Sequence, residues 1–166
     1  GYSNNRVNKS ISDVVKKGNM STLNCPEEVY LSKQIIKHHS WASMAKFTRG
    51  GGEANAVAIR IARAASGRDK VAVCGYHGWH DWYMSTNIDN KNNLNTHLMN
   101  NLPINGVPKN LKNTVFPFEY NNFKQLSKIV KMHKIGVIKM EVKRISEPKN
   151  NFLQKIRKLA TENNIV

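Results

Sequence analysis

The chain has 166 residues, about the size of one domain, and 40% of them are hydrophobic, so its composition does not indicate a disordered protein. No apolar run approaches the ~20 residues of a membrane span, and the N-terminal GYSNNRVNKS lacks the apolar core of a signal peptide. Two widely separated cysteines, Cys25 and Cys74, do not make a disulfide framework. We therefore expect a cytoplasmic protein with no membrane partner.

The formal net charge of +15 and the isoelectric point near 10.0 raise the question of nucleic-acid binding. The Lys and Arg residues are scattered singly or in pairs, and no basic run is interleaved with stacking aromatic residues. An Asn- and Lys-rich composition raises the isoelectric point without a selected partner. We therefore do not expect nucleic-acid binding, and we keep a non-catalytic basic binding module as an alternative function.

Two helices are expected in the first part of the chain. The first spans 26–38, because Pro26 and two acidic residues suit a first helical turn after Asn24 as the N-cap. The second spans 53–66, where Ala, Ile and Arg dominate, and Gly67 stands where a C-terminal glycine cap belongs.

The apolar runs KVAVCG (70–75) and IGVIKMEV (135–142) predict buried strands, although the second contains the charged Lys139. Helices are expected over 122–132 and 151–162, and Ile165-Val166 has the apolar character of the start of another strand. This alternation predicts an α/β fold with a mostly parallel sheet and flanking helices. Because the alternation stops in mid-pattern, we expect an incomplete domain.

Residues 84–121 hold many Asn residues and three prolines with little periodicity, so a long loop is expected there. Loops of this length are usually functional or disordered. Apolar residues recur along it, which favours an ordered excursion.

The three consecutive glycines at 50–52 directly precede the second helix. A backbone without side chains can approach an anion closely, and the N–H groups and dipole of a helix N-terminus attract it. Neither a P-loop Gly-Lys-Ser/Thr nor a GxGxxG spacing is present, so a flexible turn is the alternative.

The strand at 70–75 leads into Tyr76-His77-Gly78-Trp79-His80-Asp81-Trp82. Ligands of open α/β sheets bind at the carboxyl ends of strands, so an aromatic ring and a His there would face what the glycines hold. A ligand with a flat ring and a phosphate group fits both the glycines and the aromatic residues. A metal held by His77, His80 and Asp81 lacks an evident fourth ligand and is not expected. A Trp-rich corner that only packs is the remaining alternative.

The run GGEANAVAIRIARAASGRDKVAVCGYHGWHDWY closely resembles the class III pyridoxal-phosphate-dependent aminotransferases, in particular the branch akin to glutamate-1-semialdehyde aminomutase. Residues 18–35, 105–122 and 139–166 resemble further segments of the family in the same order. The resemblance implies part of the large domain of a fold type I pyridoxal-phosphate transferase, truncated at both ends. Its parts would be an N-terminal helical segment (1–40), a phosphate loop with helix and strand (41–83), the long loop (84–121) and a helix–strand–helix segment (122–166).

The family's functional residues can be carried over where the motifs match. Its phosphate-binding motif falls on Gly50-Gly51-Gly52-Glu53-Ala54, its ring-stacking aromatic on Tyr76, and its Glu-Pro after a central strand on Glu141-Val142. The implied pyridoxal 5'-phosphate-binding residues are Gly50, Gly51, Gly52, Tyr76, His77 and Glu141.

This sequence departs from the family pattern at three positions. Gly50 replaces a hydroxyl residue, which removes a side-chain hydrogen bond of about 1 to 2 kcal/mol if that bond is buried. Val142 replaces a proline, and Lys139 puts a charge into a strand that should be buried.

The resemblance places the Asp that pairs with the pyridine nitrogen, and the Schiff-base Lys, beyond Val166. We therefore assign no catalytic residue within the chain and expect it to be inactive on its own. The implied activity is transfer of an amino group between an amino donor and a carbonyl acceptor, with glutamate-1-semialdehyde 2,1-aminomutase as the alternative. A homodimer of the full-length protein is also implied.

Overall fold

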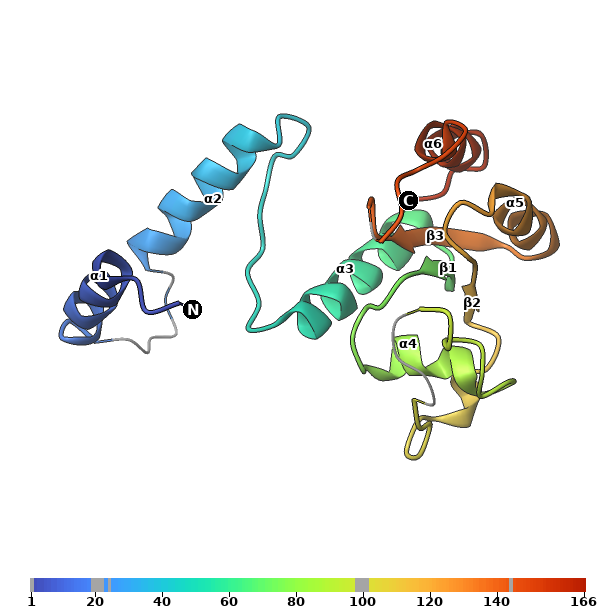
Figure 1. Cartoon of the computed structure of the whole chain (residues 1–166), viewed down its shortest axis with the longest axis horizontal. Coiled ribbons are helices and arrows are strands. Elements are labelled where there is room, and N and C mark those ends of the chain that lie inside the picture. The colour runs from blue at the N-terminus through green and yellow to red at the C-terminus, as the bar shows by residue number, and fades with distance from the viewer. Residues whose placement is uncertain (1, 19–22, 24, 98–101, 144) are drawn as a thin grey trace. The chain divides into compact units, whose positions relative to one another are not determined.

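The computed structural model describes residues 2–18, 23, 25–97, 102–143 and 145–166 (Figure 1). The chain divides into two compact units, residues 1–47 and residues 48–166. The first unit contains the helices α1 (Asn5–Val15) and α2 (Pro26–His38). The second contains, in order, α3 (Gly51–Ser66), β1 (Lys70–Cys74), α4 (Asp81–Met84), the 3-10 turns η1 (Ser85–Asn87) and η2 (Lys109–Leu111), β2 (Val115–Pro117), α5 (Phe123–Met132), β3 (Ile135–Met140) and α6 (Phe152–Glu162).

In the first unit neither helix buries a residue. The Asn4 side chain caps α1 by accepting from the backbone N–H groups of Arg6 and Val7, at 3.1 and 3.2 Å. Helix α2 has the predicted bounds, with Pro26 in its first turn. The predicted N-cap is wrong, since Cys25 occupies that position without a side-chain cap bond and Asn24 lies outside the described residues.

The second unit is built on a parallel three-stranded sheet in the order β2-β1-β3. Val71 in the central strand pairs with Val115 on one side and with Val137 on the other. After α6, the Val166 N–H donates to the Gly136 carbonyl at 3.0 Å, and the Val166 carbonyl accepts from the Ile138 N–H at 2.9 Å. This is the bonding of a parallel strand pair, so the predicted parallel sheet with flanking helices is confirmed.

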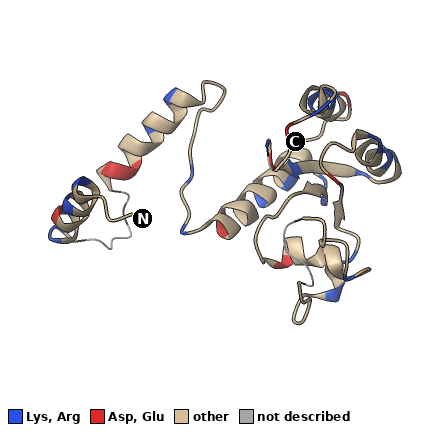
Figure 2. Ribbon diagram, in the orientation of Figure 1, with Lys and Arg blue, Asp and Glu red and all other residues tan. Residues whose placement is uncertain are grey.

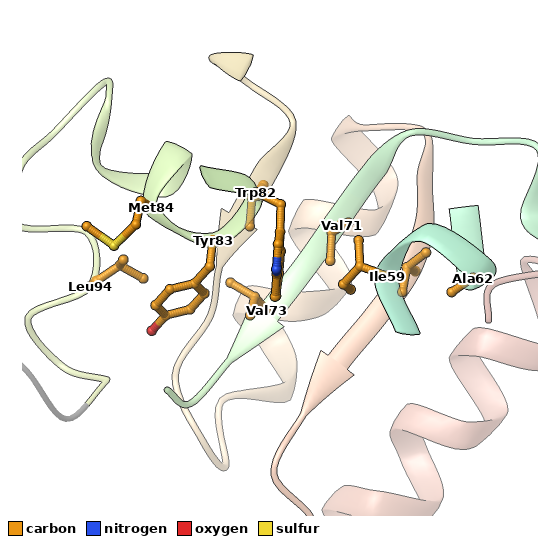
Figure 3. Close-up of a cluster of buried hydrophobic side chains, with 10 residues drawn as sticks. Ile59, Ala62, Val71, Val73, Trp82, Tyr83, Met84 and Leu94 are labelled. Atoms are coloured by element: carbon orange, nitrogen blue, oxygen red, sulfur yellow. The ribbon is translucent and has the colours of Figure 1, made fainter. Parts of the chain in front are cut away.

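Alternate residues of β1 face two separate hydrophobic cores. Val71 and Val73 belong to a cluster with Ile59 of α3 and with Trp82 and Tyr83 of α4 (Figure 3). The remaining β1 side chains, Ala72 and Cys74, belong to a second cluster with residues of α5 and α6, among them Leu126, Phe152 and Ile156. Helix α3 therefore covers one face of the sheet, and α5 and α6 cover the other.

Several boundaries differ from the sequence expectations. Residues 84–121 are not a loop throughout: they contain β2, a three-residue strand that the pattern missed because only its pairing with β1 identifies it. Helix α3 begins at Gly51, two residues earlier than expected, with Gly50 as its N-cap. Strand β3 ends at Met140, so Glu141 and Val142 follow the strand.

Gly136 gives a test of the packing between β3 and the turn that follows α3. A Cβ at this position would lie 2.6 Å from the Arg68 Cβ and 2.8 Å from the Arg68 carbonyl oxygen. We expect Gly136→Ala to lower the free energy of unfolding by about 2 kcal/mol, because a buried strand backbone must shift. Urea unfolding followed by circular dichroism measures the change.

The matched control is Gly51→Ala, because a Cβ at Gly51 meets no atom within 4 Å and alanine suits a helix. This variant should be as stable as the parent chain or slightly more stable. Equal stability of the two variants would contradict the packing described for Gly136.

Candidate functional site

The N-terminal turn of α3 lies in backbone contact with the loop after β1. A Cβ added at Gly78, whose φ is +100°, would lie 2.8 Å from the Cα of Gly52. A Cβ added at Gly52 would lie 2.9 Å from Cε1 of His80. The Asn55 side-chain amide also donates to the His77 carbonyl at 3.2 Å. Two glycines therefore permit the close approach, and an asparagine one turn into the helix fastens it.

The α3 N-terminus keeps its backbone donors available. Gly50 is extended, with φ −162° and ψ 163°, and provides no side-chain cap. The N–H groups of Gly51, Gly52 and Glu53 precede the first intrahelical bond, which runs from Ala54 to the Gly50 carbonyl, and no described side chain caps them. Together with the dipole of a 16-residue helix, these donors give this end of α3 a positive partial charge of the kind that attracts anions.

The segment before α3 is hydrogen-bonded to the start of the helix. The Glu53 carboxylate accepts from the backbone N–H of Arg49 at 2.9 Å, outside the helix. The Thr48 hydroxyl donates to the Gly50 carbonyl at 3.1 Å. The only acidic side chain of the first turn is thus engaged by the incoming chain.

Beyond β1, Gly75 turns the chain with φ +99° and places Tyr76 half-buried at the end of the strand. The Tyr76 ring meets the ring of Tyr83 edge-on, with centroids 5.9 Å apart, and the Tyr83 hydroxyl donates to the Gly75 carbonyl at 2.9 Å. Tyr83 is completely buried, so it holds this turn from the core side.

His77 lies in the protein interior, with 3% of its surface exposed. Its Nε2 is 2.8 Å from the Cys74 carbonyl oxygen, while its own carbonyl faces Asn55 of α3. The structure therefore places the His77 ring against the end of β1 and its backbone against α3. This is the position of a residue that fixes the turn carrying Tyr76.

Glu141 reaches the same turn from β3. A Cβ added at Gly75 would lie 2.9 Å from the Glu141 carboxyl carbon, so the Glu141 side chain packs directly on the Gly75 backbone. Two residues earlier, Lys139 is half-buried, and burial lowers the pKa of its ammonium while Glu141 opposes that shift.

Direct contacts thus bring the predicted site residues together: Gly52 contacts Gly78, His77 contacts α3, and Gly75 contacts Glu141. Sequence reasoning missed Asn55 and Tyr83, which position this group. Asn55 could have been noticed as an amide in a helix of small and apolar residues, whereas nothing in the sequence marks the contact of Tyr83 with Gly75.

In the part of the chain that the structure describes, no three His, Cys, Asp or Glu residues are grouped to hold a metal. The helices described there include none that is both long and apolar enough to cross a membrane.

Comparison with curated proteins shows what this chain resembles. It is 32% identical to a glutamate-1-semialdehyde 2,1-aminomutase of Sulfolobus acidocaldarius, over all of this chain and 40% of that protein. It is 26% identical to a 3-aminobutyryl-CoA aminotransferase of Cloacimonas acidaminovorans, over 98% of this chain and 37% of that protein. The chain is thus similar to aminotransferases and aminomutases that depend on pyridoxal phosphate. No family model matches it.

Solved structures agree on the fold. A transaminase with bound pyridoxal phosphate superposes with a TM-score of 0.84 at 18% identity, covering all of this chain and 40% of the other. An omega-transaminase from Sphaerobacter thermophilus gives 0.80 at 19% identity, with the same coverage. The fold is that of part of a fold type I transaminase, and the chain spans about 40% of the length of these relatives.

The backbone contact at Gly78 can be tested against a matched glycine. Both Gly78 and Gly106 have positive φ, +100° and +86°, so alanine is strained at either, but a Cβ at Gly106 meets nothing within 4 Å. We expect Gly106→Ala to cost about 1 kcal/mol of stability. Gly78→Ala should cost at least about 1 kcal/mol more, because α3 must move away from the loop. Urea unfolding measures both, and equal losses would contradict the contact.

The burial of Lys139 gives a pH dependence. Its pKa is lowered in the folded state, so the folded chain binds fewer protons than the unfolded chain between that pKa and the ordinary 10.5, and stability rises with pH across this interval. Lys139→Met should stabilise the fold at neutral pH by on the order of 1 kcal/mol, since apolar atoms replace a buried ammonium. The gain should shrink as pH approaches 10.5.

The exposed Lys134 is the control for this measurement. Lys134→Met should leave the stability unchanged at each pH, within error. A gain from Lys139→Met that did not vary between pH 7 and pH 10.5 would show that charge burial is not its origin.

Proposed function

We propose that this chain forms the phosphate- and ring-binding part of a pyridoxal-phosphate-dependent aminotransferase. The observation that carries the proposal is the uncapped N-terminus of α3, which Gly52 and Gly78 hold against the loop that presents Tyr76. Its available N–H donors suit a phosphate, and a half-buried aromatic ring at the end of the central strand suits a pyridine ring.

Each of the site residues then has a role. The Gly51, Gly52 and Glu53 N–H groups bind the phosphate, with Gly50 as the extended residue that leads into them. Tyr76 lies against the ring of the cofactor, and His77 fixes the turn that carries Tyr76. Glu141 lies at the same edge of the sheet through its contact with Gly75. When bound, pyridoxal phosphate supplies an electron sink for amino transfer.

The reaction proposed for the whole protein is transfer of an amino group from an amino donor to a carbonyl acceptor. The aminotransferases among the relatives support this reading. An aminomutase is the second candidate, because a relative with 32% identity is a glutamate-1-semialdehyde 2,1-aminomutase. No residue between Gly1 and Val166 is assigned to the chemical step.

We also propose a homodimer in the full-length protein. The described residues of the first unit bury no side chain, yet α1 exposes Val7, Ile11 and Val14 at helical spacing, and α2 exposes Val29 and Leu31. The apolar stripe on α1 is of a kind expected to be covered by another surface. The family resemblance supports a second copy of the chain as the partner that covers this surface.

We also propose a cytoplasmic location. Cys25 and Cys74 form no disulfide, in keeping with that location.

Substitution of Gly51 tests the phosphate site without altering the helix. Gly51 is the first residue of α3, where proline is well tolerated, and the preceding Gly50 is extended as proline requires. Gly51→Pro removes one N–H donor and should weaken binding of pyridoxal phosphate to the 166-residue chain about tenfold, the effect of losing one hydrogen bond to a charged group. Equilibrium dialysis measures the dissociation constants.

Gly51→Ala is the matched control, because it keeps the N–H and meets no atom within 4 Å. It should bind the cofactor as the parent chain does. Pyridoxal, which lacks the phosphate, should bind equally weakly to all three chains. Saturable binding of pyridoxal phosphate that Gly51→Pro leaves unchanged would overturn the phosphate site.

The two candidate reactions differ in the number of substrates, so activity of the full-length protein separates them. An aminotransferase forms product only when both an amino donor and a carbonyl acceptor are present. An aminomutase converts glutamate 1-semialdehyde with no added acceptor. Chromatographic detection of the products under both conditions decides between them, and no turnover in either would count against the enzyme reading.

A further inference from the structure

A cavity lies on the face of the sheet covered by α5 and α6. Its volume is about 460 Å³, and its walls come from two segments, residues 120–124 at the start of α5 and residues 149–155 at the start of α6. Its aromatic residues belong to the core on this face, whereas α3 and the Tyr76 turn pack on the other core. The cavity is therefore separate from the candidate cofactor site.

Three lysines border the cavity, and its described lining includes no acidic residue. Lys124, Lys149 and Lys155 make no ion pair with any residue that the structure describes. The nearby Glu147 is engaged by Lys143 in an ion pair. Figure 2 shows basic residues on both α5 and α6. Three positive charges thus surround one cavity, with no compensating carboxylate among the residues described there.

Tyr120 and Phe152 line the cavity together with the three lysines. The rings of Tyr120 and Phe152 meet edge-to-face with centroids 5.2 Å apart, and Phe152 is buried. The Tyr120 hydroxyl donates to the Val142 carbonyl at 2.6 Å, and burial raises the pKa of this phenol, which therefore stays neutral. Because Phe152 is buried, the ring that a ligand in the cavity can contact is that of the half-buried Tyr120.

Asn121 holds the two walls together. Its side-chain amide donates to the Glu147 carbonyl at 3.0 Å, and its amide oxygen accepts from the Lys149 N–H at 2.9 Å. The segment that carries Lys149 is thereby tied to the start of α5, which carries Lys124. The two segments that carry the lysines are held together without a ligand, so binding one requires little reordering of the backbone.

We propose that this cavity binds the phosphate group of a small soluble phosphate ester whose apolar or ring portion rests on Tyr120. Lysine ammonium groups bind phosphate as point charges, and three of them match a dianion. The volume falls within the range of small-molecule sites, roughly 300 to 1,000 Å³. The inference does not depend on the proposed aminotransferase function, since it uses other residues on the other face of the sheet.

Isothermal titration calorimetry on the 166-residue chain tests the site with three probes: adenosine 5'-monophosphate, inorganic phosphate and adenosine. The nucleotide should bind with one-to-one stoichiometry and more tightly than inorganic phosphate, and adenosine should not bind. Lys124→Gln, Lys149→Gln and Lys155→Gln should each weaken nucleotide binding about three- to fivefold, as for exposed charges. Lys149→Arg should retain most of the affinity.

Lys134→Gln is the matched control, an exposed lysine outside the cavity that makes no ion pair with a described residue. It should leave the affinity unchanged. A loss equal to that of the cavity variants would mean unspecific attraction to a basic chain, and this would overturn the site. Absence of saturable binding up to millimolar nucleotide would do the same.

Two further measurements distinguish the cavity from a lipid-binding surface and from the α3 N-terminus. In sedimentation with vesicles that contain phosphatidic acid, the affinity of the chain for the vesicles should be lower than its affinity for the soluble nucleotide. Strong binding to the vesicles without nucleotide binding would make a lipid surface the partner and overturn the proposal. Gly51→Pro should not alter nucleotide affinity. If it did, the nucleotide would be occupying the α3 N-terminus and the cavity assignment would be wrong.

Discussion

The close approach of Gly52 to Gly78 is the constraint on which the geometry of the candidate site depends. Helix α3 is about 24 Å long and returns to β1 through a short turn, so its N-terminus reaches the edge where β1 ends. Only residues without side chains at both positions let the two backbones meet there. The contact sets the uncapped end of α3 beside the turn that carries Tyr76, and a side chain at either position would separate them.

The position of the loop that contacts α3 depends on how the central strand β1 is packed. Val71, Ala72 and Val73 are completely buried because the strand has a neighbour on each side and a core on each face. Two side chains then hold its end: the Tyr83 hydroxyl donates to the Gly75 carbonyl, and His77 Nε2 lies 2.8 Å from the Cys74 carbonyl oxygen. These contacts hold the turn after β1 in place, as the positioning of a cofactor ring requires.

Features that depend on neighbouring residues in the sequence could be predicted, whereas features that depend on contacts between distant segments could not. The unit of α3 and β1 was predictable, because glycines, a helical composition, Gly67 and an apolar run follow one another within a few turns of chain. Strand β2 was not, because three residues ending in Pro117 form a strand only through pairing with β1. The inward orientation of His77 was equally hidden, since it depends on the turn at Gly75 and on the core beneath it. The individual cofactor assignments stay predictions, while the contacts around them are now defined.

The basic charge of the chain also has a different meaning once the residues are placed. Spread along the sequence, Lys124, Lys149 and Lys155 are ordinary surface lysines, yet the fold brings them around one cavity. The two faces of the sheet would then attract anions by different physics. At α3 the attraction comes from backbone N–H groups and a helix dipole, whereas at the cavity it comes from full charges on flexible side chains that salt screens. Ionic strength should therefore weaken the second interaction much more than the first, so that a phosphate bound at α3 persists in salt that releases one from the lysines.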